Sequence, residues 1–164
     1  MSAAVLNAHR AGLVALLAAV PDVGIMHERE RYAKDEAAFR ALYLYQPAPG
    51  DPYAGGEPHI RGWWLRRVAS EAVSTTVASV LDTHTWELRG FMAFNDAAGS
   101  ELVFDRLIED MRDAVLVDPS LGGVADPGPL GEDEGMRVIE AGPVRFAGVL
   151  CHTAVLQTKT WSYS

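Results

Sequence analysis

The sequence predicts an α+β fold in which a mostly antiparallel β-sheet is flanked by α-helices. Two helical patterns, at about residues 3–20 and 100–116, are separated and followed by clustered strand-like segments. Several connections between those segments are too short for the crossover that parallel neighbours need. Because 164 residues suit one ordinary domain, we expect a single domain spanning residues 1–164.

The N-terminal third begins with a helical pattern. Apolar residues recur at helical spacing and stop before Pro21, namely Leu6, Leu13, Leu17 and Val20. Residues 23–27 form a short apolar run after a turn signal, which favours a strand. The spacing of aromatic residues in 28–46 favours a helix, although its final Leu-Tyr-Leu-Tyr suits a strand equally well.

The middle of the chain contains a loop followed by strands. Residues 47–58 hold four prolines and three glycines, which indicates a loop with an exposed tip. Residues 60–69 alternate as a strand, with Trp63 and Trp64 on opposite faces. Residues 71–80 suit either an edge strand or a flexible hairpin arm. Residues 83–94 give the clearest strand pattern, with Gly90 near its centre.

The last third begins with the helix at 100–116, whose apolar and charged residues lie on opposite faces. Residues 118–135 contain three prolines and five glycines, which predicts a second long loop. Loops of this length are often functional or become ordered on contact with a partner. Two β-rich runs follow, with Gly142-Pro143 as the expected turn between them.

Composition restricts the function. A formal charge of −8 and a pI near 5.0 work against general affinity for nucleic acid or anionic membranes. The single cysteine, Cys151, excludes an intrachain disulfide framework. No run approaches the roughly 20 apolar residues of a membrane helix, and the N-terminus lacks a signal-peptide order, so we expect a cytosolic protein.

The sequence shows no recognisable catalytic motif, and we expect no enzyme, no metal and no cofactor. Cys151 and His152 are adjacent strand residues that should point to opposite faces, which argues against a thiol nucleophile with its base. The acidic loop residues 132–134 lack the spaced ligands of a calcium loop. A metal site formed by Asp82 and His84 with His152 remains the minor alternative.

A neighbouring subunit would explain several unusual side chains. Trp63 and Trp64 lie on opposite faces of one strand, so either the protein's own helices or a partner must cover the second indole. The candidate interface residues are Trp63, Trp64, Val77, Leu121, Glu132, Asp133 and Trp161. We also expect residues 70–80, 118–135 and 158–164 to contact neighbours, and deletion of 118–135 to leave the fold intact.

Four stretches, covering about half of the chain, resemble the tail terminator family of long-tailed phages and prophages. They are Arg61-Gly62-Trp63-Trp64-Leu65-Arg66-Arg67, His84-Thr85-Trp86-Glu87-Leu88-Arg89-Gly90-Phe91 with the following Asn95-Asp96 and Ser100-Glu101, the helix ending before Asp118-Pro119-Ser120-Leu121-Gly122-Gly123, and Gly148-Val149-Leu150-Cys151-His152 with the closing strand. Members of this family share size and pattern more than an invariant motif.

The resemblance implies a tail-terminator-like subunit without catalytic residues. Such subunits form a ring, here expected to be hexameric, at the head-proximal end of the tail tube. The ring would stop tube polymerisation and join the tail tube protein to the head-completion or neck protein. DNA would pass through the lumen without specific binding, in a virion assembled in the host cytoplasm.

Two other functions remain open. The first is another connector of the same particle, such as a neck or minor tail protein. The second is a small enzyme or ligand-binding domain with a site built from Asp82, His84 and Cys151.

Overall fold

The computed structural model describes residues 2–132 and 135–164. A six-stranded sheet forms its centre, with the strand order β1-β3-β4-β6-β5 and with β2 paired to β3. Within the described residues only β1 and β3 pair in parallel, and the other pairings are antiparallel. The predicted α+β class with a mostly antiparallel sheet is therefore confirmed.

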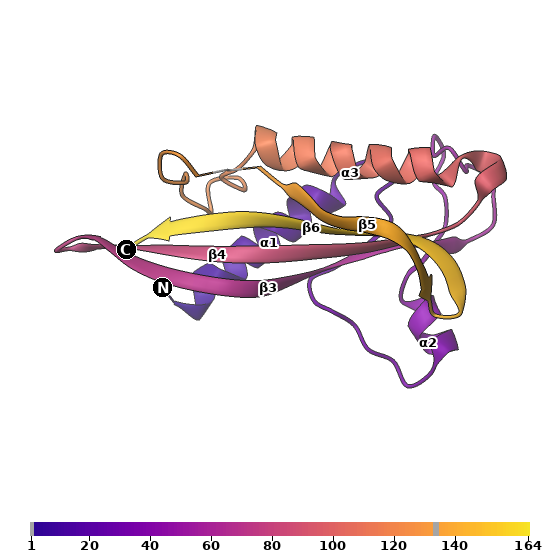
Figure 1. Cartoon of the computed structure of the whole chain (residues 1–164), viewed down its shortest axis with the longest axis horizontal. Coiled ribbons are helices and arrows are strands. Elements are labelled where there is room, and N and C mark those ends of the chain that lie inside the picture. The colour runs from indigo at the N-terminus through magenta and orange to yellow at the C-terminus, as the bar shows by residue number, and fades with distance from the viewer. Residues whose placement is uncertain (1, 133–134) are drawn as a thin grey trace.

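Long strands run along the molecule, and helix α3 lies along one side of them (Figure 1). In chain order the elements are α1 (Ala3–Ala18), β1 (Ile25–His27), α2 (Glu36–Ala41), β2 (Leu44–Tyr45), β3 (His59–Thr76), β4 (Ser79–Ala93), the short 3₁₀ helix η1 (Asp96–Ala98), α3 (Ser100–Val117), β5 (Arg137–Phe146) and β6 (Val149–Tyr163). Both predicted long helices are present at nearly the expected bounds.

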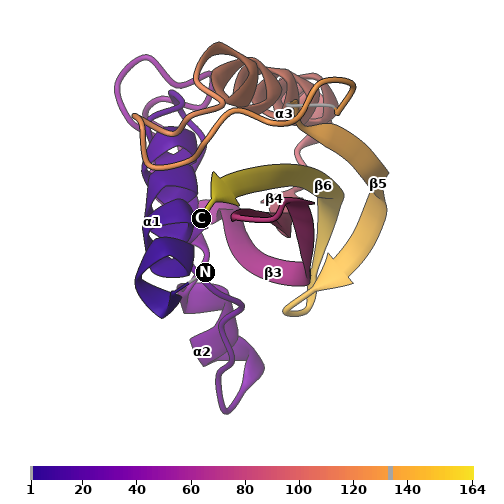
Figure 2. The same ribbon diagram turned by 90° about the vertical axis from the view of Figure 1, so that its left-hand side faces the viewer.

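The main core lies between the sheet and the helices α1 and α3, which pack on the same side of it (Figure 2). Trp63 is fully buried there, and its indole stacks on Phe104 with 5.4 Å between ring centroids. The indole also lies directly against Gly90, where an added Cβ would stand 2.1 Å from Cε3 of Trp63. Gly90 therefore makes room for one of the two tryptophans of this core.

A second, smaller core covers the opposite face of the sheet near α2. Tyr43, Trp64, Phe91 and Phe146 are buried in it, and the last two stack with centroids 3.9 Å apart. Phe39 of α2 packs against Phe146 from outside. Trp63 and Trp64 thus lie on opposite faces, as their alternation predicts.

One local prediction was right in part and one was wrong. Within residues 28–46 the helix is limited to Glu36–Ala41, and Leu44–Tyr45 forms β2, which confirms the strand alternative for the end of this segment. The last hairpin turns at Ala147 and Gly148, whose φ angles of 47° and 76° suit a two-residue turn, and not at Gly142-Pro143. Pro143 instead lies within β5, which has β6 as its one neighbour in the described part of the chain, so the missing N–H costs no ladder hydrogen bond.

Candidate assembly surfaces

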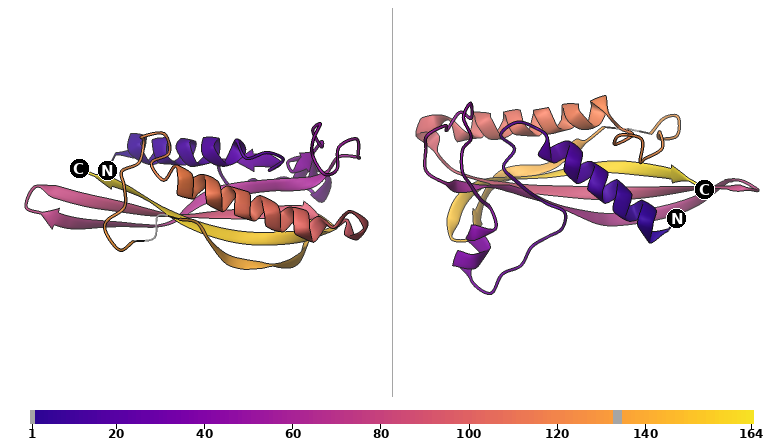
Figure 3. Two further views of the ribbon diagram at one scale, coloured as in Figure 1. Left: turned by 90° about the horizontal axis from the view of Figure 1, so that it is seen from above. Right: turned by 180° about the vertical axis from the view of Figure 1, so that it is seen from behind.

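The far halves of β3 and β4 form a hairpin arm that extends beyond the helices (Figure 1). Residues 66–78 are all exposed, and Val77 at the turn is fully exposed. Because β3 and β4 are also strands of the central sheet, the arm is continuous with that sheet. The C-terminus lies at the same end (Figure 3), where Val80 and Ser164 exchange backbone hydrogen bonds of 2.8 and 3.0 Å.

The arm leaves one edge of the sheet without a partner. On its outer side β3 pairs with β2 and β1 only as far as Trp64. In the part of the chain that the structure describes, no strand pairs with the outer side of residues 65–76. At the other end of the sheet, β6 is the one strand among the described residues that pairs with β5. The subunit therefore presents two strand edges whose backbone groups are open to a partner.

The two edges differ in how they resist pairing. In β5 a register shift lies between Val138 and Glu140, and Pro143 removes one donor. In β3 register shifts lie between Arg67 and Ala69 and again near Ser74, which leaves residues 69–74 regular. Bulges and proline are devices that discourage uncontrolled edge pairing. Residues 69–74 carry neither.

The structure separates the seven candidate interface residues into three groups. Val77 is exposed at the tip of the arm, and Glu132 is exposed and pairs with Lys159, with Nζ 2.5 Å from Oε2. Four are buried within the subunit: Trp63, Trp64, Leu121 and Trp161. Asp133 lies outside the described residues.

The chain's own residues cover the four buried candidates, so none of these side chains is exposed to a partner in the subunit. Trp63 donates from Nε1 to the carbonyl of Val23 at 2.9 Å. Trp161 lies against Gly128, where an added Cβ would stand 3.0 Å from the indole, and its carbonyl accepts from the amide of Asp126. Sequence alternation places side chains on a face, but it does not say which loop covers that face.

The 118–135 loop is correspondingly part of the fold. Leu121 and Ala125 are 7% and 6% exposed and belong to the main core. Asp126 forms an isolated bridge with Trp161 at the edge of β6. Deleting this loop would open the core, which corrects the expectation that the fold would survive the deletion.

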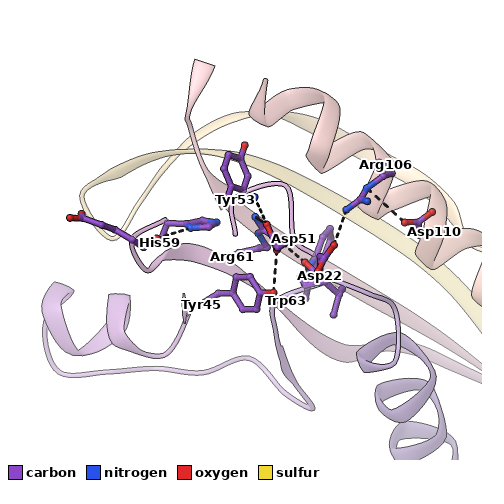
Figure 4. A network of polar contacts seen from close by, with 11 residues as sticks. Asp22, Tyr45, Asp51, Tyr53, His59, Arg61, Trp63, Arg106 and Asp110 are labelled. Atoms are coloured by element: carbon purple, nitrogen blue, oxygen red, sulfur yellow. Dashed lines mark hydrogen bonds and ion pairs between the residues drawn. The ribbon is translucent and has the colours of Figure 1, made fainter. Parts of the chain in front are cut away.

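The 47–58 loop is held by a buried ion pair (Figure 4). Nη1 of Arg61 donates to Oδ2 of Asp51 at 2.5 Å, and both side chains are completely buried. The guanidinium carbon of Arg61 lies 4.8 Å from the ring centre of Tyr45 and 5.2 Å from that of Tyr53. The loop is exposed as predicted at residues 48–50, 52 and 54–58, and Asp51 is a buried exception for which the sequence offered no signal.

Further hydrogen-bond donors stabilise the ionised carboxylate of Asp51. The amide of Tyr53 donates to Oδ1 of Asp51 at 2.7 Å, and the hydroxyl of Tyr45 donates to Oδ2 at 3.2 Å. Burial alone would raise the pKa of Asp51, but these hydrogen bonds and the Arg61 guanidinium outweigh it and lower the pKa. The arrangement orders the loop and pairs the two buried charges with each other.

A second polar cluster lies beneath α1. Nδ1 of His9 lies 3.0 Å from Oγ1 of Thr160, which accepts from Nε1 of Trp86 at 2.8 Å. Nδ1 of His84 lies 2.7 Å from Oγ of Ser70. Burial lowers the pKa of both histidines. These contacts join α1 to the sheet where the arm begins.

The structure does not bring together Asp82, His84 and Cys151. His84 lies opposite Thr160 of β6, whereas Cys151 lies opposite Ala93 at the other end of β4. Ala93 follows His84 by nine residues along β4, or roughly 30 Å at the usual rise per residue. The proposed site of these three residues is therefore contradicted by the strand register.

The histidine beside Cys151 is also distant from Asp82 and His84. Nε2 of His152 lies 2.8 Å from Oγ of Ser100, and its ring stacks near Phe104. Cys151 is fully buried in the second core, and burial raises the pKa of its thiol to about 11. Among residues 2–132 and 135–164, no group of three or more His, Cys, Asp or Glu side chains is placed to hold a metal ion.

Comparison with known proteins does not assign a family. The sequence matches no protein-family model and no curated protein. Across the described part of the chain, no helix combines the length and apolar character needed to cross a bilayer.

Proposed function

We propose that this chain is a structural protein of a tailed phage or phage-like particle, acting as the tail terminator. Its copies form a ring at the head-proximal end of the tail tube, where they stop tube polymerisation. The ring joins the tail tube protein to the head-completion or neck protein. The resemblance of four sequence stretches to the tail terminator family supports this choice of particle.

The exposed hairpin arm is the observation that best supports an assembly role. Thirteen consecutive residues, 66–78, are exposed, and the tip of their hairpin reaches beyond the covering helices (Figure 1). A long exposed strand edge carries a risk of unwanted pairing. Such an edge is useful when a partner strand covers it, and head-to-tail contacts between copies generate rings.

The charge of the chain fits the passage of DNA through such a ring. A formal charge of −8 gives little general attraction for phosphate backbones. On this account DNA crosses the lumen without being held.

Another connector of the same particle is the second candidate, because an exposed arm and two free edges serve a neck or minor tail protein equally well. Tail length separates the two. Loss of a terminator gives overlong or headless tails, whereas loss of a neck protein leaves tails of normal length.

A shortened arm tests the proposal without opening the core. Val73 and Leu81 lie opposite each other, so the residues between them can be replaced by Asn-Gly, a favoured two-residue hairpin turn. Particles carrying this variant are expected to show overlong tails in micrographs. The matched control is Ala147→Asn, which changes the hairpin turn at the other end of the sheet. Normal tail lengths with the shortened arm would argue against the proposal.

A further inference from the structure

We propose that the acidic outer face of α3 in one copy docks on the uncovered face of the central sheet in the next copy. The outer face of α3 comprises Glu101, Leu102, Asp105, Glu109, Asp113 and Leu116. The uncovered sheet face is centred on Arg66, Glu87, Arg89, Arg137, Gln157 and Lys159. This inference rests on the proposed ring and names the two surfaces that join its subunits.

Helices cover one face of the sheet along β3, β4 and β6. On β4, Trp86 and Leu88 are buried in the main core beneath α1 and α3. Their neighbours Glu87 and Arg89 project to the other face and are half-buried. Helix α1 lies behind these strands in Figure 1 and in front of them when seen from behind in Figure 3. On the other face, the second core is limited to the end near Phe146, so a neighbouring copy can add a third layer over the middle.

Cations outnumber carboxylates on the uncovered sheet face. The register places four side chains in one row across the strands, namely Arg66, Glu87, Gln157 and Arg137. Arg89 and Lys159 lie two residues from this row, on opposite sides of it. The face thus sets four cations against the carboxylates of Glu87 and Glu140, a net charge of +2 in a chain whose formal charge is −8. Lys159 also pairs with Glu132 of the loop, and Nε of Arg89 has no hydrogen-bond partner among the described residues.

The outer face of α3 carries the opposite charge. Its exposed carboxylates recur every four residues, at Glu101, Asp105, Glu109 and Asp113. Like charges at this spacing destabilise a helix, so the stripe does not serve the stability of α3. The stripe is about 18 Å long, and the row of four sheet residues is about 14 Å wide. Leu102 and Leu116 are 76% and 64% exposed at the two ends of the stripe, where they can supply apolar contact.

The two surfaces lie on opposite sides of the subunit, because α3 packs on the face of the sheet that carries the main core. One copy can therefore use both surfaces at once, each with a different neighbour. Head-to-tail contacts of this kind generate rings. A twofold dimer through either surface would set carboxylates against carboxylates or cations against cations, and such like-charge contacts are destabilising.

Charge reversal tests this contact on the full chain. Asp105 and Asp113 are exposed, and D105K/D113K should unfold at or above the wild-type temperature because it removes repulsion along α3. In sedimentation it should raise the concentration for half-assembly by about tenfold. R137E on the sheet face should raise that concentration severalfold, and the three substitutions together should restore it to within about threefold of wild type. R145E reverses a charge on the other face of β5 and should leave assembly unchanged.

Chemical cross-linking identifies the two surfaces directly. Lys34 and Lys159 are the lysines of the chain, and Lys159 lies on the uncovered sheet face. A carbodiimide joins an amine to a carboxylate. In assemblies that mix isotope-labelled and unlabelled chains, mass spectrometry should find Lys159 of one copy linked to the α3 carboxylates of another. K159R should lose these links and still assemble.

Assembly that tolerates both charge reversals, or the absence of links between Lys159 and α3 of different copies, would overturn this interface and leave the proposed role standing. Loss of DNA from particles carrying R137E, with assembly intact, would overturn it too, because the sheet face would then bind nucleic acid. A wild-type chain that stays monomeric, in particles whose tails have normal length without it, would contradict the proposed function itself.

Discussion

Arg61 and Asp51 form an ion pair that is completely buried, with Nη1 2.5 Å from Oδ2. The pair joins β3 to a loop whose sequence, rich in proline and glycine, gives no reason to expect a fixed position. Because neither charge reaches water, each depends on the other to offset its desolvation.

Removing the charge of Asp51 should destabilise the protein strongly. Asp51→Asn leaves the Arg61 guanidinium buried and uncompensated, and breaking a buried pair in this way costs about 3–5 kcal/mol. The free energy of unfolding from urea titration measures the loss. Glu57→Gln, an exposed position in the same loop, should change it by less than about 0.5 kcal/mol. Equal stability of the two variants would show that the pair does not hold the loop.

Gly90→Ala should disrupt the main core. The new methyl group would stand 2.1 Å from Cε3 of Trp63, so the indole or the strand must move. Overpacking of this kind costs about 1–3 kcal/mol, measurable by thermal unfolding. Gly142→Ala on β5 is the matched control, because its Cβ would meet nothing within 4 Å. A wild-type melting temperature for Gly90→Ala would contradict the observed packing.

Stability should fall on mild acidification in part through His9. Burial lowers the pKa of His9, and the smaller effects of the Val124 backbone and Asp126 act in the opposite direction. The fold therefore prefers neutral His9, and its contribution is complete above the unfolded pKa of about 6.5. That contribution is lost as the pH falls through the lowered folded pKa.

Denaturant midpoints measured between about pH 7 and pH 5 check this effect of His9. The wild type should lose stability with a steeper slope than His9→Asn, which cannot take up the proton. His59, His84 and His152 remain in both proteins. Because His9 helps to lower the pKa of His84, whose ring lies 6.1 Å away, the difference in slope reports His9 together with its effect on His84. Equal pH slopes for the wild type and His9→Asn would show that His9 does not contribute to the loss of stability.

Cys151 should be unreactive in the folded protein. Its thiol is fully buried and its pKa is raised to about 11, so the reactive thiolate is scarce near neutral pH. A chromogenic thiol reagent should label it only at the rate of unfolding, and rapidly in denaturant. Rapid labelling of the native protein would contradict its burial.

Periodicity predicted most of the fold because it reports which residues face a core. The helices that became α1 and α3, the alternation of Trp63 and Trp64, and the long strands β4 and β6 all follow from local pattern. The turn predicted at Gly142-Pro143 was wrong because proline usually indicates a turn, whereas an edge strand such as β5 tolerates it.

The candidate site was less predictable, since it depends on contacts between distant segments. The buried tryptophans looked like interface anchors because the loops that cover them, such as the one containing Gly128, are far away in sequence. The partnership of Asp51 with Arg61 has no local signal for the same reason. The exposed arm was predictable as a β-rich run, but only its register with β4 shows how far the edge extends.

Self-association is the central claim, and imaging the purified full-length protein tests it most directly. Electron micrographs at rising concentration should show closed rings of uniform diameter, which the variant with the shortened arm fails to form. A uniform field of single subunits at every concentration would contradict the account.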